Sequence, residues 1–291
     1  MGWIRQEGKL NQNTYLIDSF LNNERKTMAS FLLKGTEKKA LIDSSGPENA
    51  FNILERLKSM NLIPDILILT HSHWDHAGGT HIFQENIKNL EVFAVKSGVK
   101  SLKKNKKYNN PFYPFFKDLK SIEGIKVVEN EEEINLGELT LKIYETPGHT
   151  NCSISIFDEK NKNLIIGDVL GYLWTKELII PPIMPPDFSE EKLFSSFEKI
   201  KDIDYKSLSL AHFGFLTEEF ALNFLQKAED SYIEWRDFFI SKWKEYDNLN
   251  EIVKSFISQL NSIGIFDPGG KISHNMIGEW IVKGLKSDKL I

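Results

Sequence analysis

The sequence predicts an α/β protein, classed as α+β in some schemes, that ends in a helical appendage. Short apolar segments of strand length, such as residues 65–70, alternate with segments whose apolar residues have helical spacing, such as residues 48–60. From about Glu218 onward the pattern is helical, with few strand signals. We therefore expect one domain at residues 1–217 and a C-terminal helical extension at residues 218–291.

Composition is typical of a globular chain that can bury a sizeable core. Of 291 residues, 41% are hydrophobic and 26% are charged, and the net charge is −5. The apolar runs are too short to span a bilayer, and the first residues lack the apolar core of a signal peptide. The single cysteine, Cys152, excludes an internal disulfide and fits a reducing compartment. We expect a cytoplasmic protein with no membrane partner, and the acidic balance disfavours a nucleic-acid partner without excluding it.

Local patterns predict the order of the elements. Strands are expected at residues 14–20, 29–35, 39–43, 65–70, 91–95, 139–150, 152–159, 163–168 and 207–214. Helices are expected at residues 48–60, from about 78, and at 190–203, 218–265 and 273–286. Segments 152–159 and 163–168 should pair as neighbouring strands. The proline-rich segment 172–188 is expected to be a loop.

A lysine-rich and aromatic segment, residues 96–119, interrupts this pattern. Five lysines lie between Lys100 and Lys107, and two prolines then follow among four aromatic residues. We interpret the segment as an excursion from the core. It could be a solvated loop, a site for an anionic or nucleic-acid substrate, or a lid over an active site. The residues lining such a lid would be Tyr108, Phe112, Tyr113, Phe115 and Phe116.

Residues 70–79, THSHWDHAGG, place three of the seven histidines of the chain and one aspartate within six positions. His71 and His73 would face the same side of an extended segment, and Asp75 and His76 follow in a turn that can fold back toward them. Neutral imidazoles and carboxylates are good ligands for zinc and similar divalent ions. Unpaired, they would be poor core material. The stretch therefore predicts a metal site.

Four further residues stand where a predicted apolar strand meets a loop. His149 lies in TPGHT after a Pro-Gly turn, and Asp168 closes LIIGD. His212 ends SLSLAH, and Asp43 lies in LIDSSGP. They share the local context of the histidine stretch, so we expect them to be its partners. An ordinary turn-capping role remains open for Asp43.

The ordered set H-x-H-x-D-H, TPGHT, GD after a strand and a late strand-end histidine resembles the metallo-β-lactamase superfamily. The match covers roughly residues 14–216. This resemblance implies an αββα sandwich, in which two mixed sheets pack together, helices lie outside and metals lie at one edge.

The resemblance also implies a role for each motif residue. Seven of them would hold two metals, in two sets joined by one carboxylate. These are His71, His73 and His149 for the first metal, Asp75, His76 and His212 for the second, and Asp168 as the bridge. Asp43 would orient the histidine loop through hydrogen bonds. The two divalent ions, zinc by preference with iron or manganese as alternatives, would share a water or hydroxide with a pKa lowered toward about 7.

Two residues differ from the motifs of particular members of the superfamily, and they limit which branch the chain resembles. Asp168 stands where class B1 β-lactamases have a cysteine ligand, which argues against lactam hydrolysis. His73 stands where flavodiiron proteins carry a glutamate. The pattern therefore resembles the glyoxalase II, lactonase and tRNA-processing nuclease branches, although the basic and aromatic glutathione-binding tail of glyoxalase II is not identifiable in this chain.

Other candidate residues have plainer expected roles. Tyr172, in the proline-rich loop, could donate a hydrogen bond to an oxyanion, and Trp174 could reach the substrate. His81, on a predicted helix, and His274 are expected to be structural. Cys152 is expected to be a small buried strand residue.

These observations predict a dinuclear metal hydrolase that uses a metal-bound hydroxide on an ester, thioester, lactone or phosphodiester in a small-molecule substrate. Three alternatives remain: a mononuclear iron oxidoreductase similar to the persulfide dioxygenases of the same superfamily, a metal-dependent nuclease, and a non-enzymatic metal-binding scaffold. The extension 218–291 is expected to cap the substrate or to form a homodimer interface. Its slight acidic excess disfavours a nucleic-acid module.

Overall fold

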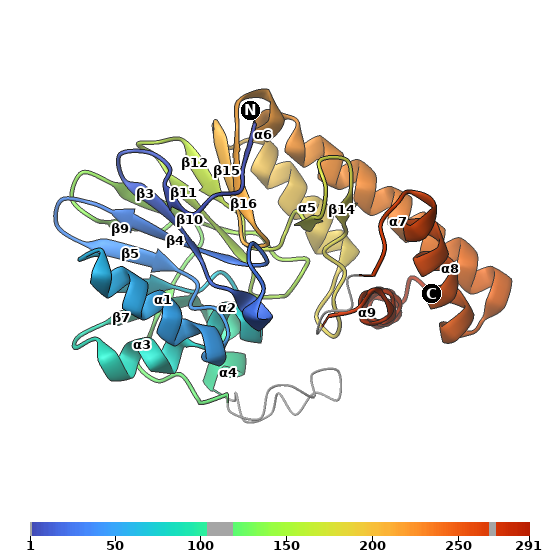
Figure 1. Ribbon diagram of the computed structural model, residues 1–291, viewed down its shortest axis with the longest axis horizontal. Coiled ribbons are helices and arrows are strands. Elements are labelled where there is room, and N and C mark those ends of the chain that lie inside the picture. Colours follow the sequence, from blue (N-terminus) through green and yellow to red (C-terminus); the bar gives the residue numbers. More distant parts are fainter. Residues whose placement is uncertain (1, 104–118, 268–271) are drawn as a thin grey trace.

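Two seven-stranded sheets pack face to face between two layers of helices (Figure 1). This computed structural model describes residues 2–103, 119–267 and 272–291. The expected αββα sandwich and its C-terminal helices are confirmed. Within the described ranges, no helix is both long enough and apolar enough to cross a membrane.

The first sheet has the strand order β2-β3-β4-β5-β6-β7-β8 and is antiparallel up to β5 and parallel from β5 to β8. Its strands are Gly8–Lys9, Thr14–Asp18, Ala29–Lys34, Lys39–Ile42, Ile66–Ile68, Glu91–Val95 and Ile125–Val128. Its connections contain the short helix η1 (Leu21–Asn23), α1 (Pro47–Ser59), α2 (Trp74–Ala77), α3 (Thr80–Asn86) and α4 (Lys96–Lys103). Apolar residues of α1 and α3 bury the outer face of this sheet.

The second sheet has the order β1-β16-β15-β12-β11-β10-β9, and among these neighbours only β12 and β15 run parallel. Its strands, from β1, are Trp3–Ile4, Gly214–Thr217, Ser207–Leu210, Asn163–Ile165, Ile154–Asp158, Thr140–Glu145 and Glu133–Asn135. Side chains alternate between the two faces of a strand, so Leu141 and Ile143 of β10 point into the core between the sheets. The expected pairing of residues 152–159 with 163–168 is confirmed by the antiparallel pair β11–β12.

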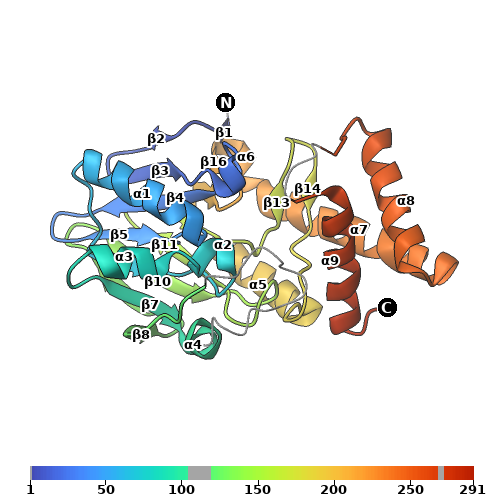
Figure 2. The same ribbon diagram turned by 60° about the horizontal axis from the view of Figure 1, so that its bottom comes forward.

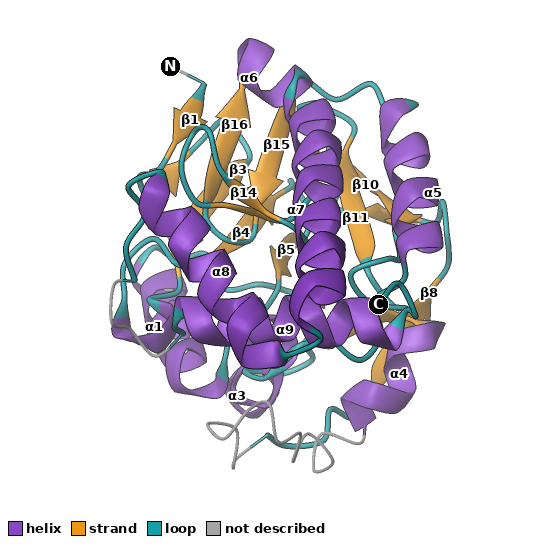
Figure 3. Cartoon of the chain, turned by 90° about the vertical axis from the view of Figure 1, so that its right-hand side faces the viewer, coloured by secondary structure: helices purple, strands orange, loops and turns teal. Residues whose placement is uncertain are grey.

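The C-terminal helices pack on the outer face of the second sheet. They are α6 (Glu218–Leu222), α7 (Phe224–Tyr246), α8 (Leu249–Ser262) and α9 (His274–Ser287), and they follow α5 (Glu190–Lys201) and β16 in the chain. Figure 3 shows the long helix α7 running across that face. Buried residues of α5, α7, α8 and α9 form one continuous hydrophobic cluster with the sheet. A boundary at residue 217 stays a prediction, since this cluster joins the two parts.

Three local predictions differ from the structure. The expected loop 172–188 contains a two-stranded hairpin, β13 (Tyr172–Leu173) and β14 (Ile179–Ile180), whose strands are too short to give a periodic pattern. The first residues of the lysine-rich segment form α4, because Leu102 packs into the helical layer of the first sheet. Residues 104–118, with the aromatic residues of the predicted lid, lie outside the described residues. Cys152 is buried as expected but lies in a turn before β11.

Candidate metal centre

All predicted ligands lie in connections at one edge of the sandwich. The histidine loop follows β6, whose parallel neighbour β5 ends just before Asp43. Asp168 follows β12, and His212 follows its parallel neighbour β15. Because parallel neighbours end at the same edge of a sheet, each sheet brings its polar residues to one place. His149, after β10, completes the set from the second sheet.

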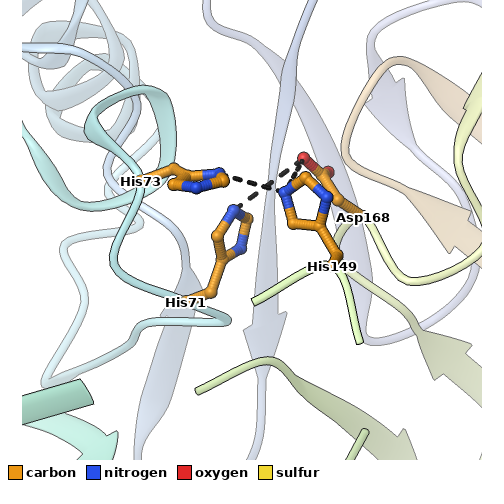
Figure 4. Close-up of side chains that lie close together, drawn as sticks. All are labelled: His71, His73, His149 and Asp168. Atoms are coloured by element: carbon orange, nitrogen blue, oxygen red, sulfur yellow. Dashed lines mark hydrogen bonds and ion pairs between the residues drawn. The ribbon is translucent and has the colours of Figure 1, made fainter. Parts of the chain in front are cut away.

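Four side chains form the first group: His71, His73, His149 and Asp168. Figure 4 shows them pointing toward a common centre, and one ligand atom from each lies within 4.8 Å of the others. His149 Nε2 is 3.0 Å from His73 Nδ1 and 3.5 Å from Asp168 Oδ2. His71 Nε2 is 3.9 Å from the same Asp168 oxygen.

Asp75, His76 and His212 form the second group, whose ligand atoms also lie within 4.8 Å of one another. The Asp75 Oδ2 atom is 3.5 Å from His212 Nε2 and 3.8 Å from His76 Nε2. Asp168 Oδ2 is 3.3 Å from each of these two histidine nitrogens. The Asp168 carboxylate therefore lies between the two groups, where the resemblance placed a bridging ligand.

Hydrogen bonds to the outer nitrogens fix how three of these rings face the centre. Nδ1 of His149 donates to the Pro182 carbonyl at 2.9 Å, and Nδ1 of His212 donates to the Thr27 carbonyl at 3.2 Å. Nδ1 of His76 donates to Asp43 Oδ2 at 2.7 Å. A neutral histidine that donates from Nδ1 leaves the Nε2 lone pair for a ligand, so these rings, when neutral, have the tautomer that a metal requires.

Asp43 holds the histidine loop in place. Its carboxylate is buried and accepts hydrogen bonds from the Thr70 backbone N–H at 2.8 Å and from the Thr70 hydroxyl at 2.7 Å, besides the bond from His76. Its φ of 61° lies in the left-handed region, which aspartate and asparagine tolerate better than most residues. Both partners, Thr70 and His76, come from another segment, so the Asp43 carboxylate joins two segments of the chain, and its orienting role stays a prediction.

Protonation differs between the two groups. Burial, together with neighbouring histidines, holds the pKa of His71 and of His73 well below the usual value. Burial also opposes the charged form of His76, but the carboxylates of Asp168 and Asp43 outweigh it and hold the pKa of His76 well above the usual value. The pKa of His212 is raised for the same reason, against burial and chiefly by Asp168. Metal binding to the second group therefore competes with protonation of His76 and His212.

The donor set fits divalent metal ions. Within the described residues, His71 Nε2 and His76 Nε2 are buried and make no hydrogen bond. Buried polar atoms without partners are costly, and here they are aimed at a shared centre that contains other imidazole nitrogens and carboxylate oxygens. These are the ligand types of zinc, iron and manganese sites.

The remaining candidates lie outside both groups. His81 is buried in α3 and its Nδ1 lies 3.1 Å from the Gly78 carbonyl oxygen, which fits a helix role but not an exposed one. His274 is buried, with its ring 5.0 Å from that of Trp174. The Cys152 Sγ lies 3.4 Å from the Ser72 hydroxyl. Tyr172 faces the site: its ring centroid lies 5.3 Å from that of His212.

Sequence patterns missed several contributors to the site. Thr70 adjoins the histidine motif and could have been noticed as a hydroxyl at the end of a buried strand. The backbone carbonyls of Pro182 and Thr27 leave no signal in side-chain patterns. A cavity lies over the two metal groups, and residues of α9 line part of it. No local feature of the α9 sequence links this helix to the distant histidines.

Together, the sandwich and its edge cluster define a protein of the αββα class with a histidine- and carboxylate-lined candidate metal site. The sequence profile of the Metallo-beta-lactamase superfamily matches residues 11–212. The chain therefore belongs to this superfamily, as the motif resemblance implied.

Comparison with individual proteins gives more distant similarity. The chain is 26% identical over 179 residues to glyoxylase B2 of Dictyostelium discoideum, which covers 58% of this chain and 59% of that protein. It is 24% identical over 211 residues to an N-acyl homoserine lactonase of a Bacillus species, covering 72% and 77% respectively. The matches span about two fifths to three fifths of the length of several curated relatives.

Among solved structures, a metallo-beta-lactamase family protein of Thermus thermophilus superposes with a TM-score of 0.68 at 15% identity. This similarity covers 96% of the present chain and 93% of the other, so it extends through the C-terminal helices. At this identity it shows the fold alone.

Proposed function

We propose that the protein is a metal-dependent hydrolase that cleaves an ester, thioester, lactone or phosphodiester with water activated at a dinuclear centre. The central supporting observation is the position of Asp168 Oδ2, within 3.9 Å of His71 and His149 from one group and of His76 and His212 from the other. One carboxylate between two sets of imidazoles is a ligand arrangement suited to two neighbouring ions. The similarity to a lactonase adds support for hydrolysis.

Each residue has a defined part in this proposal. Bound divalent ions would polarise the scissile group and lower the pKa of a water toward about 7. The imidazole rings, oriented by their outer hydrogen bonds, would hold the ions in place. The Asp75 carboxylate lines the cavity and could take up the proton of the attacking water. Burial raises the pKa of Tyr172, so its hydroxyl stays protonated and can donate to a developing oxyanion.

Metal removal tests the proposal. We expect purified protein to contain two divalent ions per chain, to lose turnover of esters, thioesters or lactones on dialysis against a chelator, and to recover it with zinc or manganese. Metal content by mass spectrometry and hydrolysis rates on the same samples measure this. One iron per chain with oxygen uptake on a glutathione persulfide would instead support the dioxygenase alternative, and turnover limited to phosphodiesters the nuclease. Protein without any bound metal would contradict all three.

Replacing Tyr172 by phenylalanine should lower kcat about tenfold while leaving metal content unchanged. This is less than the roughly 10²-fold to 10³-fold effect of losing a sole oxyanion-hole donor, because bound metals would share the oxyanion charge. Steady-state kinetics measure the change. Tyr205→Phe removes another buried hydroxyl, outside the residues that line the cavity, and should have no effect on kcat. Equal rates for Tyr172→Phe and the unmodified protein would exclude the assigned role.

A further inference from the structure

The cavity over the candidate metal centre has a floor of ligands and walls of apolar side chains. Its volume is about 220 Å³. Figure 2 shows α9 beside the β13–β14 hairpin, both of which contribute to the walls. The apolar wall includes Ile180 of β14, Ile183 and Met184 after the hairpin, and Met276, Ile277 and Trp280 on α9.

Helix α9 packs closely against residues 183–184, which follow the β13–β14 hairpin and line the cavity. A Cβ at Gly284 would lie 2.6 Å from the Cγ2 of Ile183, closer than real contacts allow, so the glycine lets the helix approach. Asp288, at the end of α9, accepts a hydrogen bond from the backbone N–H of Glu190 at 2.7 Å. The C-terminal part of α9 is therefore fixed to Ile183 of the cavity wall and to the first residue of α5.

A row of rings runs from the metal groups to α9, and its members Tyr172 and Trp174 line the cavity. The ring centroids of His212 and Tyr172 are 5.3 Å apart, those of Tyr172 and Trp174 are 5.5 Å apart, and those of Trp174 and His274 are 5.0 Å apart. His274 is buried, and its ring nitrogens have no hydrogen-bond partner within the described residues. Burial lowers the pKa of His274, so this end of the row carries no charge at neutral pH.

Apart from the imidazoles of the two metal groups, the ionisable side chains described at the cavity wall are carboxylic acids and a tyrosine. No lysine or arginine from residues 2–103, 119–267 or 272–291 lines it, and Glu24 adds a carboxylate beside those of Asp75 and Asp168. A carboxylate or phosphate on the substrate, away from the reacting bond, would lose its hydration against apolar walls without meeting a cation there. An apolar group on the substrate would instead gain free energy, because removing apolar surface from water is favourable.

We propose that the substrate is an ester, thioester or lactone with an uncharged, apolar acyl group, and that Met276 and Ile277 of α9 determine this specificity. The inference rests on the proposed hydrolase function. Each acyl methylene placed against the walls should raise kcat/KM by up to about fourfold until the cavity is filled. A terminal carboxylate on the same acyl chain should remove this gain.

The first test compares phenyl acetate, phenyl butyrate, phenyl hexanoate and the monophenyl ester of adipic acid on the metal-loaded full chain. The leaving group is constant, and hexanoate and adipate differ only at the end of a six-carbon chain. We expect kcat/KM to rise at least tenfold from acetate to hexanoate and to fall at least tenfold from hexanoate to adipate. Equal values along the series, or a preference for adipate, would overturn the inference.

The second test assigns the specificity to α9. Met276→Lys adds a cation to the wall and should lower kcat/KM for phenyl hexanoate at least tenfold while raising that for the adipate ester. Asn275→Lys is the matched control, because its side chain is exposed on the same helix and does not line the cavity. Ile277→Ala is a milder second variant that should flatten the dependence on acyl length. If Asn275→Lys and Met276→Lys change the series equally, α9 does not determine the specificity.

Product binding separates failure of this inference from failure of the hydrolase proposal. Calorimetric titration of the metal-loaded protein with acetate, hexanoate and adipate should give the tightest binding for hexanoate. If no ester is cleaved but this order holds, the hydrolase proposal is wrong and the apolar cavity assignment stands. If esters are cleaved and hexanoate binds no better than acetate or adipate, the hydrolase proposal stands and the acyl specificity is wrong.

Discussion

Replacing Asp168 by asparagine should lower hydrolysis by on the order of 10³-fold, since a metal centre contributes several kcal/mol to transition-state stabilisation. The carboxylate lies between the two groups of imidazoles, 3.3 Å from His76 Nε2 and from His212 Nε2. An amide has one oxygen acceptor and no charge, so it cannot serve both groups. Metal content per chain, measured by mass spectrometry, should fall together with the hydrolysis rate.

A surface variant controls for the effect of removing one negative charge. Asp204→Asn changes an exposed carboxylate that pairs with Lys162 at 3.4 Å and lies in neither metal group, and it should keep full metal content and turnover. Asp168→Asn protein that retains two ions per chain and near-normal rates would show that this carboxylate does not bridge a dinuclear centre. Loss of folding would be visible as a changed circular dichroism spectrum, and Asp168→Glu, which keeps the charge, should then restore part of the metal content.

Asp43→Asn should weaken metal binding about 10-fold to 100-fold, the usual cost of losing a hydrogen-bonding partner of a metal ligand. Asparagine keeps the size of the side chain and tolerates the left-handed backbone at this position. Its amide nitrogen, placed toward His76, would donate to Nδ1 and force the proton onto Nε2, where it blocks ligation. Competition titration against a metal-binding dye measures the affinity.

The control for Asp43→Asn is Asp158→Asn. Asp158 is equally buried and also accepts hydrogen bonds, from the backbone and side chain of Asn161, but it lies in neither metal group. This variant should lose stability and keep metal affinity. Equal affinities for Asp43→Asn and the unmodified protein would mean that Thr70 and the loop backbone alone orient His76.

The positions of the candidate ligands could be predicted from the sequence, because each ligand segment follows a buried strand. Residues such as His149 and Asp168 stand at the ends of buried strands, where neighbouring strands deliver them to one edge. A strand leaves a clear sequence pattern, and a histidine at its end is conspicuous. The sheet order could not be predicted in this way, because pairing partners such as β12 and β15 are far apart in the chain, and only the family resemblance supplied the architecture.

The hairpin and the position of α9 were not predicted, because both depend on contacts that leave no pattern in the local sequence. The β13–β14 hairpin consists of two-residue strands, which are shorter than any detectable periodicity. The contribution of α9 to the cavity depends on how four C-terminal helices pack, and its own sequence shows only that it is amphipathic. The local sequence pattern is enough to predict that a helix forms. Which element the helix packs against depends on the whole hydrophobic cluster.

The placement of α9 over the cavity also has a consequence for synthesis of the chain. All seven candidate ligands precede residue 213, whereas α9 begins at His274. The 62 residues from His212 to His274 take roughly 3 to 12 s to translate at about 5–20 residues/s. During that interval all seven candidate ligands have been synthesised and α9 has not. On the proposed function, a nascent chain could capture ions through an open edge, and the proposed acyl selectivity would arise only when the last helix docks.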